Sequence, residues 1–240
     1  MRITEAKLRH VIREVLEAEG TPARWGPAIS VISARAGEYV IAYDGDRLVQ
    51  EVQRAVSMGI TEPDQIIRFT SLDRLFPDRI YPLDVILSGI QVDSAYPGPC
   101  NGAKQIVGAA SRVQGEGWGS LVYMAAIDEF GQLGADRSSV SVPAERTWQS
   151  LDRRDDLGRH PYDDINDPKT PDPYDDCAVH KGRSDQVNSS FYFVEDMPVN
   201  ISMLRERGNE IEAFLGDAWP MAARFLIKMW AEVFSVAMYR

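Results

Sequence analysis

The residues with the clearest chemical potential are three glycines between a strand-like run and a helix-like run. The segment reads Ser111-Arg112-Val113-Gln114-Gly115-Glu116-Gly117-Trp118-Gly119-Ser120-Leu121. Glycine tolerates left-handed backbone conformations, so three glycines in five residues allow several N–H groups to turn toward one point. The helix that follows adds unpaired amides and the positive end of its dipole. This pattern predicts a pyrophosphate-binding site.

Two better-known phosphate-binding motifs are excluded by the spacing of these residues. A Walker loop requires Gly-Lys-Ser/Thr, which does not follow here, and a Rossmann fingerprint requires Gly-x-Gly-x-x-Gly. Gly119 comes one residue too early for that fingerprint. Glu116 is an unfavourable neighbour for phosphate unless its carboxylate points to solvent. A tight strand-to-helix turn that binds nothing is the alternative explanation of the same glycines.

The glycine segment resembles motif A of the Gcn5-related N-acetyltransferase (GNAT) superfamily. That motif reads Arg or Gln, two residues, Gly, one residue, Gly or Ala, then a Leu four positions on. Arg112, Gly115, Gly117 and Leu121 occupy these places. The resemblance implies acetyl transfer from acetyl-CoA to an amine. The cofactor-binding residues that it implies are Arg112, Val113, Gln114, Gly115, Glu116, Gly117, Trp118 and Gly119.

The elements after the glycine segment follow the same superfamily, with one departure. The family has a helix, a strand and then Asn-x-x-Ala-x-x-x-Tyr on a second helix. Here Ser141 takes the Asn place, and Trp148 takes the Tyr place four residues after Ala144. Family members often use that tyrosine to protonate the leaving thiolate, which an indole cannot do at neutral pH. Tyr192 and Tyr123 are substitutes by side-chain type, so the sequence leaves open whether the protein is an enzyme.

A narrower resemblance connects the chain to acetyltransferase-like proteins of tailed phages. These proteins contain Asp-Arg-x-x-Val-Ser, then Ala-x-x-x-Trp, and an Asp-Asp-Cys; the matching segments are Asp136–Ser141, Ala144–Trp148 and Asp175–Cys177. Leu8–Glu14 is also similar to the opening of many tailed-phage proteins. The alternative function is therefore a non-catalytic GNAT-fold structural or internal virion protein.

The hydrophobic pattern predicts an α/β or α+β fold. The resemblance implies that this fold is a GNAT-like mixed sheet flanked by helices. We expect residues 1–20 to be a docking or targeting segment with an amphipathic helix over 4–18, and one domain to follow over 27–240. The alternative is that this helix packs on the domain. The expected strands cover residues 28–33, 38–43, 85–92, 103–109, 138–142 and 191–195. The expected helices cover residues 46–58, 119–130, 143–151, 203–214 and 221–239, with a turn at Asp44-Gly45.

The negative charge of the chain is concentrated in one segment. The net charge is −10, and residues 151–176 hold nine aspartates against four basic side chains. We expect 152–188 to be an irregular, largely exposed acidic insertion without a required metal, because so many carboxylates cannot all be buried. Calcium bound by Asp163, Asp164, Asn166 and Asp167 and zinc bound by Cys100, His160, Cys177 and His180 are the alternatives. In an acyltransferase, this segment would favour a basic amine acceptor.

The composition narrows the class of protein. A chain of 240 residues, 44% hydrophobic and 26% charged, suits an ordinary globular domain. It contains no long uncharged apolar run, no signal-like start and two cysteines, which together predict a cytoplasmic protein, in the host cell or a virion if the phage resemblance holds. Its acidity argues against nucleic acid as a partner, and few basic residues flank the apolar helix at 221–239, which argues against a membrane. That helix must be covered by the chain's own sheet, by self-association or by a virion contact.

Overall fold

The structure is a computed structural model, and it describes residues 25–60, 82–93, 103–135, 140–161, 163–164, 171, 176–177, 190–194 and 199–238. The strands are β1 (Pro27–Ala34), β2 (Gly37–Asp44), β3 (Ile86–Asp93), β4 (Lys104–Ser111), β5 (Gln132–Gly134), β6 (Leu157–Pro161), β7 (Asp163–Asp164), β8 (Asp176–Cys177) and β9 (Ser190–Val194). The α-helices are α2 (Gly45–Ser57), α4 (Trp118–Phe130), α5 (Val142–Leu151), α6 (Val199–Leu215) and α7 (Trp219–Met238). Short 3-10 turns, η2 (Pro82–Val85) and η3 (Gly216–Ala218), precede β3 and α7.

The main sheet has seven strands in the order β1-β2-β3-β4-β5-β9-β6. The first four strands form an antiparallel meander, and β4 and β5 are parallel. A parallel pair needs a crossover, and α4 supplies it. Strands β9 and β6 then continue the sheet in antiparallel fashion. The α/β class and the order strand, glycine segment, helix, strand, helix are therefore confirmed.

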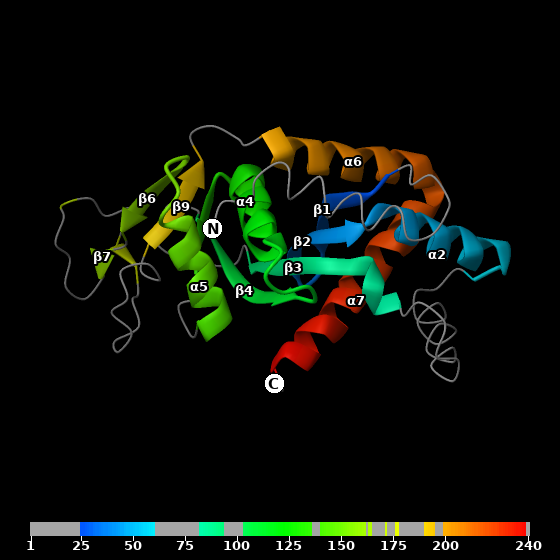
Figure 1. Ribbon diagram of the computed structural model, residues 1–240, viewed down its shortest axis with the longest axis horizontal. Helices are drawn as coiled ribbons and strands as arrows, with labels where there is room; N and C mark the ends of the chain where they lie inside the picture. Colours follow the sequence, from blue (N-terminus) through cyan, green and yellow to red (C-terminus); the bar gives the residue numbers. More distant parts are fainter. Residues whose placement is uncertain are drawn as a thin grey trace.

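Helices cover both faces of the sheet, and each face has its own hydrophobic core (Figure 1). Alternate side chains of a strand point to opposite faces, which divides the strand residues between the two cores. One core joins α4, α5 and the first half of α6 to Ile29, Val40, Ile90 and Ile106. The other joins α2, α7 and the end of α6 to Tyr39, Ile41, Tyr43 and Ile86.

Helix α7 packs on its own sheet, as the first of the expectations for this helix required. Phe225, Leu226 and Met229 are fully or almost fully buried against the core that α2 shares. Further along, the Trp230 indole lies against Gly89 of β3 and Gly108 of β4; a Cβ on Gly89 would lie 2.4 Å from Trp230 Cδ1. These two glycines therefore make room for the indole in the sheet surface. The Trp230 ring also stacks on Phe234 with 5.2 Å between centroids.

Three expectations about local structure are wrong. Asp44 and Gly45 form no turn: Asp44 is the N-cap of α2, and its Oδ1 accepts a hydrogen bond from the Arg47 amide at 3.1 Å. The fifth strand lies at β5, and Val142, expected at a strand end, begins α5. The acidic insertion is not irregular throughout, because β6 is an edge strand of the main sheet and β7 pairs with β8 in parallel.

The amphipathic helix expected over residues 4–18 lies outside the described residues. Most of the acidic insertion also lies outside them, so its expected exposure stays a prediction. Among the helices that the structure describes, none combines the length and apolarity needed to cross a bilayer.

Candidate functional site

The glycine segment follows the last residue of β4, a central strand of the sheet. Because β3 runs antiparallel to β4, the end of β4 lies beside the start of β3, with Ser111 opposite Ser88. The amides of Arg112 and Val113 donate hydrogen bonds to the Leu87 carbonyl oxygen at 3.1 and 3.5 Å. The segment is therefore fixed to β3 at its beginning and leaves the sheet only after Val113. We call residues 112–119 the glycine loop.

Two glycines of the loop adopt conformations that other residues rarely take. Gly115 has a φ of 82° and Gly117 a φ of 87°, both in the left-handed region. A Cβ built on Gly115 would meet nothing within 4 Å, so the space around it is open. The loop is thus a turn that only glycine makes cheaply, with its backbone accessible from outside.

Helix α4 begins at the end of the loop with no side chain capping it. Gly117 is the N-cap, no side-chain hydrogen bond is made there, and the first turn carries no acidic residue. Leu121 donates the first backbone bond back to the Gly117 carbonyl, so the amides of Trp118, Gly119 and Ser120 have no acceptor within the helix. These amides and the helix dipole favour an anion at this position.

The side chains of Glu116 and Trp118 interact with each other. Trp118 is buried beneath the loop, and its indole N–H donates to Glu116 Oε2 at 3.4 Å. Trp118 can therefore reach a ligand through its backbone amide and not through its ring. The Glu116 carboxylate is the one negative charge among residues 112–119, and its indole contact draws it toward the start of α4.

Arg112 is held by an ion pair that the sequence did not indicate. Its Nε donates to the Ile86 carbonyl oxygen at 2.8 Å, and its Nη1 lies 2.9 Å from Asp84 Oδ1. The same Asp84 carboxylate lies 3.8 Å from Arg47 Nη1 of α2. All three side chains are about one-third exposed, so the pairing is weak and an arriving anion can compete for Arg112.

The edge of β4 that faces β5 is paired only at its beginning. Among the described residues, β5 pairs with Lys104 and Gln105 and no further along β4. Val107 is an extra residue in the register with β3, where Gln91 faces Gly108 and Val92 faces Ile106. Such a bulge redirects backbone groups of the bulged strand. The stretch from Val107 to the glycine loop is therefore a strand edge with N–H and C=O groups available to an extended ligand.

The three aromatic residues singled out in the sequence form one cluster beside the first half of α4. The Trp148 ring stacks on Tyr192 at 5.1 Å and meets Tyr123 edge-on at 5.0 Å. Helix α5 brings Trp148 there, and it contacts α4 close to the loop, since a Cβ on Gly119 would lie 3.9 Å from Thr147 Oγ1. The structure thus brings Trp148 together with both tyrosines, Tyr123 and Tyr192.

Both tyrosines of the cluster are buried and keep their protons at neutral pH. Burial raises the pKa of the Tyr123 phenol above its usual range. Burial raises the pKa of Tyr192 in the same way, and the nearby Asp152 carboxylate adds to this increase. The Tyr192 hydroxyl donates to Asp152 Oδ1 at 3.5 Å, and Arg159 Nη1 lies 2.8 Å from the same oxygen. Neither phenol can serve as a base, and the Tyr192 proton is directed at Asp152.

Sequence reasoning located the loop and the aromatic residues but missed the charges around them. Asp84 and Arg47 next to the loop, and Asp152 and Arg159 next to Tyr192, come from segments distant in sequence. No local pattern marks them. Within the part of the chain that the structure describes, no three histidine, cysteine or carboxylate side chains gather as metal ligands would. The calcium and zinc alternatives rest largely on residues outside that part.

The chain was compared with protein-family models, with curated proteins and with solved structures, and none of them matches it.

Proposed function

We propose that the protein binds acetyl-CoA at the glycine loop and acts as a GNAT-like acyltransferase, moving an acetyl group to an amine. The observation that carries this proposal is the junction of β4 and α4. There, two left-handed glycines turn the chain from a strand edge with no partner among the described residues into a helix start that no described side chain caps. An open backbone cradle at a free helix N-terminus suits a pyrophosphate.

The residues of the site fit the parts of this cofactor in order. Backbone amides of Gln114 to Gly119 would hold the pyrophosphate, since the Val113 amide is bonded to the Leu87 carbonyl oxygen. Arg112 would exchange Asp84 for a phosphate oxygen. The free edge of β4 offers peptide groups to the two amides of the pantetheine arm, as a strand does to its neighbour. Val107 lies four residues before Ser111, about 13 Å along the strand. The thioester end would then lie beside the bulge.

The chemistry assigned to the protein is limited to positioning and charge. When bound, acetyl-CoA would supply a thioester from which the acyl group passes to the amine nitrogen, while the C–S bond breaks and coenzyme A leaves as a thiol that takes up the proton lost by the amine. The chain would hold the thioester beside the free edge of β4, with α4 on one face of the sheet and α7 on the other. There the amine would approach the acyl carbon from a fixed direction. The acidic insertion would attract a protonated amine, such as a lysine side chain or a polyamine. Tyr192 and Tyr123 stay the candidates for the proton donor.

A second function, a non-catalytic GNAT-fold protein of a phage particle, is favoured by one observation. Trp148 occupies the place of the family's acidic tyrosine, is 1% exposed and is enclosed by Tyr123 and Tyr192. The Tyr192 hydroxyl donates its hydrogen bond to Asp152, so its proton is not directed at a leaving thiolate. A protein of this kind would retain the loop without transferring the acetyl group.

An assay of thiol release separates the two functions. The protein is incubated with acetyl-CoA and, in parallel, with spermidine, poly-lysine or no acceptor, and free thiol is measured. Acceptor-dependent release that is lost in Gly117→Val supports the acyltransferase. Binding of acetyl-CoA without release would support the non-catalytic function, and an absence of binding would contradict the site itself.

A further inference from the structure

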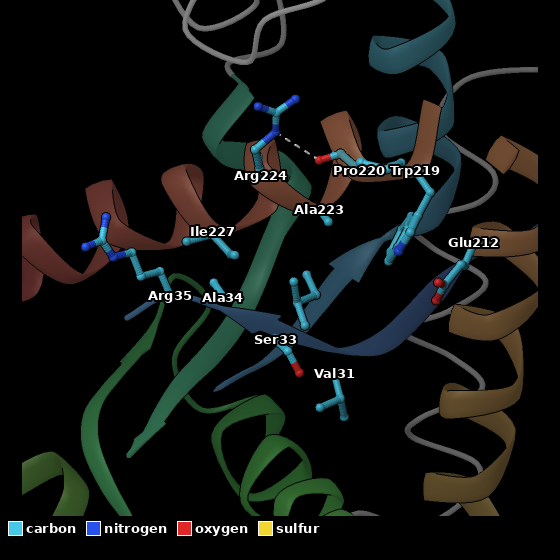
Figure 2. A pocket seen from close by; sticks show the side chains of 11 residues that line it. Val31, Ser33, Ala34, Arg35, Glu212, Trp219, Pro220, Ala223, Arg224 and Ile227 are labelled. Carbon is cyan, nitrogen blue, oxygen red and sulfur yellow. Dashed lines mark hydrogen bonds between the residues drawn. The ribbon is translucent and has the colours of Figure 1, made fainter. Parts of the chain in front are cut away.

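The outer edge of β1 carries a groove that the proposed acyl-CoA site does not use. Its volume is about 540 Å³, and it lies between the second half of β1, the end of α6 and the first turns of α7 (Figure 2). The residues that matter for the argument are Val31, Ser33 and Arg35 on the β1 side, Glu212 of α6, and Trp219 and Ile227 of α7. Since β1 is the first strand of the sheet, this side of it has no partner strand in the described chain.

Backbone groups of β1 point into this groove. Helix α6 lies against the same edge further back, where a Cβ on Gly208 would come 2.1 Å from the Ile29 carbonyl oxygen. The Ile29 carbonyl therefore faces away from β2. Residues two and four positions along a strand share this direction, so the N–H and C=O groups of Val31 and Ser33 also face outward. The register of β1 with β2, in which Ala34 faces Gly37 across a two-residue turn, agrees with this assignment.

Opposite charges lie at the two ends of the groove, and a third charged side chain, Arg224 of α7, also lines it and donates through its Nε to the Pro220 carbonyl oxygen. Arg35, in the turn after β1, lies at one end, and Glu212 lies at the other, with Ser33 and Val31 between them (Figure 2). A two-fold axis near Ser33, perpendicular to the strand, brings the Arg35 end of one protomer to the Glu212 end of its partner. The charges then match twice, and Ser33 of each protomer faces the other. A surface of this kind is complementary to itself.

We infer that the β1 edge is a homodimer interface, in which two copies of the chain pair their β1 strands in antiparallel fashion around a two-fold axis. The two sheets become one continuous sheet, each protomer places its Arg35 turn in the groove of its partner, and Arg35 pairs with Glu212 across the interface. The short paired stretch makes this a small interface, so the dimer dissociates on dilution.

Charge reversal tests the pairing directly. Sedimentation velocity of the full chain should show a monomer–dimer equilibrium in the wild type. Arg35→Glu and Glu212→Arg should each weaken dimerisation about tenfold, since each leaves two like-charge contacts. The double variant Arg35→Glu/Glu212→Arg should restore it. A wild type that stays monomeric at all accessible concentrations, or single variants that dimerise like the wild type, would overturn the inference.

A second pair of variants tests the backbone contact without changing charge. Ser33→Pro removes an outward N–H that β2 does not use, and proline is tolerated on an edge strand. It should abolish the dimer, while Ser33→Ala keeps the amide and should dimerise normally. Circular dichroism of each variant verifies the fold. Equal dimerisation of Ser33→Pro and Ser33→Ala contradicts strand pairing, whichever way acetyl-CoA binding turns out.

Discussion

At the scale of single residues, Gly117 and Gly131 stand at the two ends of α4 and both have a positive φ. Their φ angles are 87° and 76°. A β-branched residue in this region costs about 1–2 kcal/mol. Gly117→Val and Gly131→Val should therefore lower the melting temperature by similar amounts. Only Gly117→Val should lose its affinity for coenzyme A in calorimetric titration, because only Gly117 belongs to the loop. Equal affinities of the two variants for coenzyme A would show that the loop is not part of the binding site.

Asp84 should control how readily Arg112 reaches a phosphate. The pair is exposed, so breaking it changes the free energy by at most about 1 kcal/mol. Asp84→Asn frees the guanidinium and should tighten coenzyme A binding by up to about fivefold at low salt, with a smaller effect at high salt. Arg112→Ala is the control and should weaken binding. If Asp84→Asn also weakens it, Arg112 fixes the loop to β3 and does not contact the ligand.

At the scale of elements, the start of α2 depends on a buried carboxylate. Burial raises the pKa of Asp44, although the Arg47 amide and guanidinium oppose the increase. Ionisation of Asp44 therefore opposes folding, while its oxygen still caps the helix. Asp44→Asn keeps the cap without the charge and should be more stable than the wild type at pH 7. Asp44→Ala loses the cap and should be less stable by about 1 kcal/mol.

The pH dependence of folding stability in these variants shows whether ionisation of Asp44 opposes or favours folding. The raised pKa means that the wild type loses stability relative to Asp44→Asn as the pH rises through the folded-state pKa of Asp44. The difference in stability should vanish below the ordinary pKa of an aspartate carboxyl, 3.8, where Asp44 is protonated in both the folded and the unfolded state. Urea unfolding at several pH values measures this. If the wild type instead becomes more stable relative to Asp44→Asn as the pH rises, the contact with Arg47 stabilises the carboxylate by more than burial destabilises it.

The contact between α7 and the sheet depends on the absence of side chains at two positions. A Cβ on Gly89 would overlap the Trp230 ring, which is 3% exposed and cannot move outward without opening the core. Gly89→Ala should cost about 1–3 kcal/mol in urea unfolding. Combining it with Trp230→Leu should cost less than the sum of the two single changes, because the smaller side chain leaves room for the methyl group. Strict additivity would mean that the two residues are not coupled.

The sequence predicted those elements whose signals are local. The glycine loop and its flanking strand and helix follow from glycine spacing and helical periodicity over 104–130. Strand β5 was missed because Gln132–Gly134 is too short to show alternation, and β6 because Leu157–Pro161 has none. β5 is a strand because it pairs with β4 and β9, and β6 because it pairs with β9. Such non-local pairing leaves no mark on a single segment.

The candidate site shows the same division. Residues 112–119 could be found in the sequence, because a left-handed turn restricts residue type. The pairing of Arg112 with Asp84 could not, since the two are 28 positions apart and aspartate is common in this chain. The enclosure of Trp148 by Tyr123 and Tyr192 depends on three separate elements, α4, α5 and β9. Sequence spacing gives no information about such a contact.

At the scale of the whole molecule, the described helical layers leave two parts of the main sheet accessible: the outer edge of β1, and the β4 edge with the glycine loop. Helix α4 covers one face of this region and α7 the other. The dimer inferred at β1 lies at one edge of the sheet, three strands away from β4, so the interface and the proposed acyl-CoA sites use different strands. Ligand binding and dimerisation are thus separable properties of the fold.

The most direct test of the central claim is the thermal stability of the protein with and without acetyl-CoA. A ligand that binds the folded state at a hundred times its dissociation constant adds about 2.7 kcal/mol. For a chain of this size, each kcal/mol raises the melting temperature by about 2–4 °C. We predict a rise of several degrees with acetyl-CoA in the wild type and none in Gly117→Val. An unchanged melting temperature of the wild type at millimolar acetyl-CoA would contradict a cofactor site at the glycine loop.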